Sequence, residues 1–156
     1  MSVKNDIIDT GLVEFELSFD RGTEKIYFNP NDVDFYIRLT DMINSTSEIY
    51  ESMSKEYEKA EEAQDNREKI EILRRLNEKV RNNFDIAFGN NVSDGIFKYV
   101  SPHGIIKSKN QYYVFYILDW LMPKIAEETG KTSNEAVNAL QKAMNRHTVK
   151  YAHKFN

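Results

Sequence analysis

Residues 112–122, with the sequence YYVFYILDWLM, carry a single charge, at Asp119. A helix that is apolar on every side belongs in an interior or an interface, and this segment is shorter than the roughly twenty residues that cross a bilayer. It therefore predicts a buried helix, with Ser108 as its N-cap and Gly130 as its C-terminal stop. A buried strand over 112–118 is the alternative, because aromatic and β-branched residues also favour sheets.

A β-hairpin is predicted near the beginning of the chain. Residues 12–19 alternate between apolar side chains, such as Val13 and Phe15, and polar ones, which is the period of a half-buried strand. An Asp-Arg-Gly turn follows, and residues 24–28, ending in Phe28, supply a second strand. Because an isolated hairpin is marginal in water, its apolar face must either cover the protein's own core or meet another copy.

A long helical region is predicted next, over residues 30–88. Asn29 and Pro30 fit its N-cap and first helical residue. Apolar residues then recur at spacings of three and four, which is typical of amphipathic helices. The first stripe comprises Leu39, Met42, Ile43, Thr46, Ile49, Tyr50, Met53, Tyr57 and Ala60, and the second comprises Ile70, Leu73, Leu76, Val80, Phe84 and Ala87.

Two geometries fit this region, because neither glycine nor proline occurs between Pro30 and Gly89. One continuous helix would be about 90 Å long at about 1.5 Å per residue. A break near Asp65 and Asn66 would instead fold the two stripes together as an antiparallel helical hairpin, in which each stripe covers the other. We expect the break.

The remaining segments are shorter. Residues 93–100 are predicted to form a short helical piece, and residues 101–104, Ser-Pro-His-Gly, a turn. The last helix should start at Thr132, whose spacing to Glu135 fits a capping box. The expected fold is mainly α with an N-terminal β-hairpin (α+β), in one domain over 1–156: hairpin 12–28, long helical hairpin 30–88, core helices 93–129, and C-terminal helix with a basic tail 132–156.

Composition limits the class of protein. A chain of 156 residues fits one domain that buries about two thirds of its unfolded surface. There is no cysteine, which excludes disulfides, thiolate metal sites and a cysteine nucleophile. Residues 1–10 carry charges and no long apolar run, so they do not fit a secretory signal. We therefore expect a cytoplasmic protein that does not span a membrane.

The net charge of −4 hides an asymmetry along the chain. Residues 1–66 contain 16 acidic and 6 basic side chains, whereas residues 67–156 contain 9 acidic and 15 basic ones. From Gln141 onward there is no acid. Such a basic end suits nucleic acid, an acidic protein or the acidic half of another copy, although a merely solvated surface is an equal alternative.

A search for catalytic and ligand-binding patterns returns negatives. Gly130-Lys131-Thr132 resembles the end of a P-loop, but Ile125 stands where that motif needs its first glycine. The three histidines lack the spacing of a metal pair on one helix face, and His103, in a turn, is interpreted as structural. The paired carboxylates lie in strongly polar stretches without a dry pocket. We expect no enzyme activity, no cofactor and no metal.

The order of the segments resembles the small tail assembly chaperone-like proteins encoded by tailed phages and prophages of Gram-positive bacteria. The best residue match is Phe-Asp-Ile-Ala-Phe-Gly at 84–89, and the extension 147–156 has no clear place in the family pattern. The other matching features are Val13-Glu14-Phe15, the Glu/Lys-rich stretch with Tyr50, Tyr57 and Glu58, Ile96-Phe97, the helix from Tyr112 to Glu128, and Asn145-Arg146 in the basic end.

The resemblance implies a non-enzymatic assembly factor in the bacterial host cytoplasm, whose partners are the tape measure protein and the tail tube protein. The apolar side of the hairpin and the exposed part of the first helical stripe would then bind an amphipathic helix. The expected partner-binding residues are Val13, Phe15, Phe28, Met42, Ile49, Met53 and Tyr57, and a homo-oligomer is expected to form through Arg146, Lys150 and Lys154.

Two other functions stay open at this stage. A small phage-encoded regulator or inhibitor would use the basic end to bind nucleic acid or a host protein, but so few cations in an acidic chain favour only weak, salt-dependent contact with nucleic acid. A structural virion subunit would share the hairpin and the opposite charges.

Overall fold

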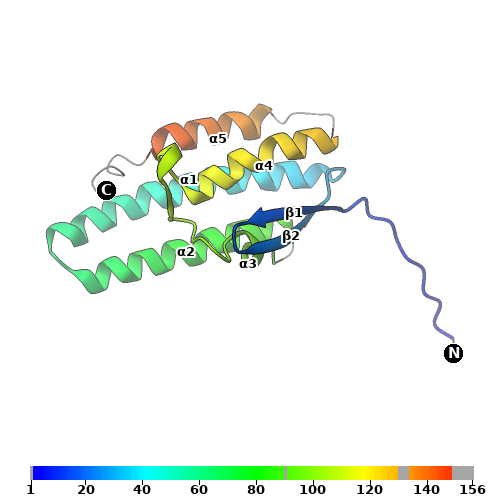
Figure 1. Ribbon diagram of the computed structural model, residues 1–156, viewed down its shortest axis with the longest axis horizontal. Helices are drawn as coiled ribbons and strands as arrows, with labels where there is room; N and C mark the ends of the chain where they lie inside the picture. Colours follow the sequence, from blue (N-terminus) through cyan, green and yellow to red (C-terminus); the bar gives the residue numbers. More distant parts are fainter. Residues whose placement is uncertain (1, 90, 130–133, 149–156) are drawn as a thin grey trace.

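The computed structural model describes residues 2–89, 91–129 and 134–148. Its elements are β1 (Val13–Phe19), β2 (Gly22–Phe28), α1 (Val33–Glu62), α2 (Asn66–Phe88), α3 (Val92–Ile96), β3 (Ile105–Ile106), a 3-10 turn (Lys107–Lys109), β4 (Gln111–Tyr112), α4 (Tyr113–Thr129) and α5 (Asn134–Arg146). The protein is mainly α with an N-terminal antiparallel β-hairpin, which confirms the predicted α+β class (Figure 1). None of the described helices is long and apolar enough to cross a membrane.

Helices α1 and α2 pack side by side as an antiparallel hairpin, so the predicted break is confirmed (Figure 1). Gln64 lies between them with a left-handed backbone, at φ 54°. Asp65 then caps α2, because its carboxylate accepts a hydrogen bond of 3.1 Å from the backbone N–H of Glu68. This cap satisfies one of the four amides that a helix leaves free at its start.

The start of α1 differs from the prediction. The N-cap is Asp32, whose carboxylate accepts a hydrogen bond from the backbone N–H of Asp34, and not Asn29. The side chain of Asn29 is engaged elsewhere, since its Oδ1 accepts from the N–H of Asn31 and its Nδ2 donates to the carbonyl of Thr10. The helix therefore begins three residues later than the Asn-Pro pair indicates.

The first predicted stripe lies in the core of the protein, with only Ile49 and Tyr57 half-buried. The second predicted stripe, on α2, is wrong at Ile70, because this residue is 57% exposed. The buried row on α2 begins instead at Ile72. Residues spaced by four share one helix face, so a row that includes Val80 and Phe84 also includes Ile72 and excludes Ile70. The remaining buried residues of this row are Leu76, Ala87 and Phe88.

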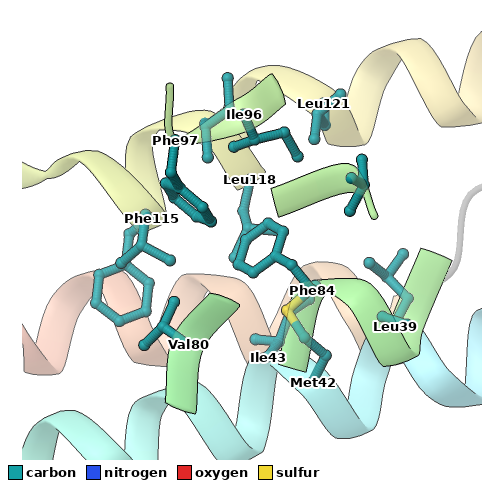
Figure 2. Close-up of a cluster of buried hydrophobic side chains, with 14 of the residues drawn as sticks. Leu39, Met42, Ile43, Val80, Phe84, Ile96, Phe97, Phe115, Leu118 and Leu121 are labelled. Atoms are coloured by element: carbon teal, nitrogen blue, oxygen red, sulfur yellow. The ribbon is translucent and has the colours of Figure 1, made fainter. Parts of the chain in front are cut away.

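Helix α4 is confirmed as the buried central helix, and the strand alternative for 112–118 is excluded beyond Tyr112. Figure 2 shows its Phe115, Leu118 and Leu121 packed among side chains of α1, α2 and α3. Trp120, in contrast, is half-buried beneath the ammonium group of Lys124, which lies 4.3 Å from the ring.

The predicted N-cap of α4, Ser108, is wrong, because this residue lies in the 3-10 turn of a small β3–β4 hairpin that the sequence did not indicate. The first amides of α4 are satisfied differently. The N–H of Tyr113 donates to the carbonyl of Gly104, and the N–H of Val114 donates to the carbonyl of Pro102. The predicted stop at Gly130 and the capping box at Thr132 lie outside the described residues.

The β1–β2 hairpin covers the protein's own core, which is the first of the two alternatives stated for it. Leu17, Ile26 and Phe28 are buried, and the Phe28 ring stacks on Phe35 of α1 at 5.3 Å between centroids. β2 packs against α3, which spans only Val92–Ile96 and is shorter than the predicted piece. Helix α5 packs on α1 and α4 through buried small and aliphatic side chains.

Candidate protein-interaction surface

Three of the seven predicted partner-binding residues are buried inside the molecule. Phe28, Met42 and Met53 are 1%, 3% and 5% exposed, so the expectation that they contribute to an exposed surface is corrected for this conformation. The reason is that the hairpin and the stripe of α1 cover the protein's own core. The other four residues, Val13, Phe15, Ile49 and Tyr57, are half-buried.

The predicted residues also do not form one surface. Phe15 stacks on Phe28 at 5.2 Å, and Phe28 stacks on Phe35 at the start of α1. Tyr57 lies near the other end of α1, about 33 Å from Phe35 at about 1.5 Å per residue. A single partner helix laid across the hairpin would therefore not also reach Tyr57 without running along most of α1.

A different group of side chains comes together at the far end of the α1–α2 hairpin, which extends beyond α4 and α5 (Figure 1). We call Tyr57, Lys69, Leu73 and Tyr112 the distal patch. The ammonium group of Lys69 lies 5.7 Å from the centre of the Tyr57 ring, and Leu73 follows Lys69 by one helical turn on the same face. Burial raises the pKa of Tyr112, and neighbouring Tyr57 adds to the rise.

One ion pair joins the two helices near the same end, and a second ion pair lies within α2. Arg75 of α2 lies 3.6 Å from a carboxylate oxygen of Glu56 on α1 and 3.2 Å from one of Glu68 on its own helix. All three side chains are substantially exposed, so the pairs contribute little to stability. These pairs place charged side chains beside the aromatic side chains of the distal patch. Such a mixture of charged and apolar groups suits contact with an amphipathic protein segment.

Of the residues predicted for self-association, the structure places only Arg146. It ends α5, and its guanidinium pairs with Glu51 of α1 at 3.2 Å in the same molecule. The pair is more than 45% exposed on both sides, so it remains accessible to solvent. Lys150 and Lys154 lie outside the described residues.

One polar contact resembles catalytic chemistry and was missed from the sequence. The hydroxyl of Ser47 lies 2.9 Å from Nε2 of His147, which is the distance of a nucleophile and its base. The ring of His147 stacks on Phe115 at 5.4 Å, and burial lowers its pKa, with Arg146 adding to this effect.

This contact lacks the rest of a catalytic site. Ser47 is 8% exposed and lies inside α1, where the backbone amides are used by the helix. Among the described residues, Ser47 is the hydrogen-bond partner of the His147 ring, and the carboxylate of Glu51 acts on the pKa of that ring through its charge. We interpret the contact as a polar link that attaches the end of α5 to α1.

His103, in the turn before β3, has its Nδ1 buried without a hydrogen-bond partner among the described residues. Burial lowers its pKa, because the charged form of the ring would lose hydration. Within the same residues, no cluster of three or more His, Asp or Glu side chains is placed to hold a metal ion.

Comparison of the chain with protein-family models, with curated proteins and with solved structures found no match.

Proposed function

We propose that the protein is a non-enzymatic assembly factor of the phage tail assembly chaperone class, which binds the tape measure protein and recruits tail tube subunits in the bacterial host cytoplasm. The observation that carries this proposal is the distal patch, where two helices leave aromatic and aliphatic side chains half-buried. The order of the elements along the chain, which resembles that class, supports it further.

The distal end of the helical hairpin is suited to a third helix. Its own core is small, because the buried apolar side chains that the two helices place near this end are Met53, Ala60 and Ile72. A third amphipathic helix lying against Tyr57 and Leu73 would complete their burial, as in helix-in-groove recognition. Tape measure proteins are expected to be long and helical, so they supply such segments repeatedly.

The test is co-expression with the matching tape measure protein. The wild-type protein should raise the soluble yield of the tape measure protein, and Leu73→Asp should abolish that gain. The matched control is Ile86→Asp, an exposed apolar position on the same helix (59% exposed) that is outside the distal patch. Circular dichroism of each purified variant establishes that it is folded.

Two results would contradict the proposal. Equal loss of yield with Leu73→Asp and Ile86→Asp would show that the distal patch has no special role. If the tape measure protein stays insoluble with the wild type, while a duplex oligonucleotide binds tightly at physiological salt, the protein is instead a nucleic-acid-binding regulator.

A further inference from the structure

In the described part of the chain, no strand pairs with the outer edge of β1. The sheet formed by these residues consists of β1 and β2, and β2 is the strand that packs against α3. Only Asp20 and Arg21 separate the closing pair of Phe19 and Gly22, so this pair exchanges both of its hydrogen bonds and the ladder alternates from there. The N–H and C=O groups of Glu14, Glu16 and Ser18 therefore point outward, away from β2.

The two faces beside this edge differ in character. On the core side, Val13, Phe15 and Phe19 are only half-buried, so a neighbouring strand would cover them further. On the solvent side, Glu14 and Glu16 are exposed, and Lys25 of β2 is the only cation paired with either of them in the described structure, at 3.0 Å from Glu14. An edge strand with free backbone groups and a half-covered apolar face is a template for strand addition.

A sequence in the same chain matches both faces. Residues 149–155 read Val-Lys-Tyr-Ala-His-Lys-Phe, an alternation with the period of a strand. Val149, Tyr151 and Phe155 fall on one side together with His153, and Lys150 and Lys154 fall on the other together with Ala152. When the first side continues the apolar face of β1, the two lysines lie opposite or diagonal to Glu14 and Glu16, where opposite charges attract.

We propose that segment 149–155 of one molecule adds as a third, antiparallel strand to the outer edge of β1 in a second copy. The donor is a second copy because His147 is held to Ser47 by hydrogen bonding, which leaves only Thr148 as a linker, and one residue spans at most about 3.6 Å. α5 packs on α1 and α4, whereas the sheet packs through β2 on α3. The end of α5 and the sheet thus contact different helices, and Thr148 alone is too short to join them.

The consequence is head-to-tail association. Each molecule offers one edge and one segment, so the contact joins two different surfaces and can be repeated without closing. This inference is independent of the proposed function, because it concerns contact between copies and not the distal patch.

The first test uses charge reversal in the full-length protein, with molar mass measured by light scattering over a concentration series at low salt. The wild type should gain mass with concentration. Glu14→Lys with Glu16→Lys, or Lys150→Glu with Lys154→Glu, should each raise the concentration needed by at least about tenfold. An equimolar mixture of the two double variants should associate again, because each then offers the other a complementary charge.

A wild type that stays monomeric at every concentration overturns the proposal, and this outcome includes docking of the segment onto its own sheet. A mixture that fails to regain mass, although both variants remain folded by circular dichroism, overturns it as well. The proposal is also wrong if the double variants associate like the wild type.

The second test separates strand addition from charge attraction alone. In the antiparallel pairing, the N–H of Ala152 faces β1, as do those of the other residues opposite Glu14, Glu16 and Ser18, whereas the N–H of His153 faces away. Ala152→Pro removes that donor without changing any charge and should abolish association, while His153→Pro should retain more of it. If Ala152→Pro associates like the wild type, the contact is not a strand and the proposal is wrong.

Discussion

Truncation of Phe84 tests the packing that holds α2 to the rest of the molecule. Phe84 is fully buried, and its ring centre lies 5.0 Å from that of Phe97 and 6.3 Å from that of Phe88 (Figure 2). A change to Ala at such a site removes the apolar contacts and leaves a cavity, which costs about 3–5 kcal/mol. The free energy of unfolding of a small domain is about 5–15 kcal/mol in total, so this single change should remove a large share of it.

The assay is urea unfolding followed by circular dichroism at 222 nm, with the free energy of unfolding obtained by linear extrapolation. Ile86→Ala is the matched control, because it lies two residues away on the same helix and is 59% exposed. It should change the free energy by less than about 0.5 kcal/mol. If Phe84→Ala costs less than about 1 kcal/mol with an unchanged denaturant slope, the packing of α2 against α3 is not as described.

Two further predictions concern the ends of helices and pH. Asp65→Ala should lower the free energy of unfolding by about 1 kcal/mol, because the N-cap of α2 is lost, while Asp65→Asn should preserve it; equal values for both variants in the same urea assay would contradict this role. Burial lowers the pKa of His103 and His147 from the ordinary value of 6.5, with Arg146 contributing to the second. The folded state then binds fewer protons than the unfolded state below that value, so stability is complete above about pH 6.5 and declines as the pH falls toward the folded pKa values. Unfolding at pH 7.5 and 5.5 should show this loss, His147→Gln should reduce it, and greater stability at pH 5.5 would refute it.

The reversal between α1 and α2 was expected because one continuous helix would be about 90 Å long. The structure adds a local signal there, since the side chain of Asp65 caps α2 by acting on an amide three residues away. The same kind of signal was ambiguous where several candidates lie close together. Asn29 and Asp32 are both good caps, and the choice depends on Asn29 bonding to Thr10, a contact that no short pattern reveals. At α4 the amides use backbone carbonyls of the preceding turn, so a search for a capping side chain selects the wrong residue.

Long-range polar contacts were outside the reach of sequence patterns. Ser47 and His147 are 100 residues apart, and Glu51 and Arg146 are 95 apart. Either residue of each pair looks ordinary by itself. The β3–β4 hairpin was missed for a related reason, since strands of two residues are too short for an alternation to be visible. The attachment of α5 to α1 therefore became visible only in the structure.

The candidate surface illustrates a limit of a different kind. An apolar stripe predicts that a helix face will be covered, but it does not say whether the cover comes from the same chain. The lengths of the helices show how much of α1 the same chain can cover. α1 has 30 residues and α4 has 17, which correspond to about 45 Å and about 26 Å. A central helix of that length cannot cover the whole of α1, and α5, which also packs on α1, ends beside Glu51. Among the described residues, the last 11 residues of α1, about 17 Å of the helical hairpin, therefore lack a third helix. α4 begins beside Tyr50, since Phe115 contacts that ring at 5.2 Å, and the uncovered length therefore falls beyond it, at Tyr57 and the residues of α2 that face it. The same stripe thus builds the core along one part of α1 and leaves a half-buried surface along the other, which is where we propose that a partner helix binds.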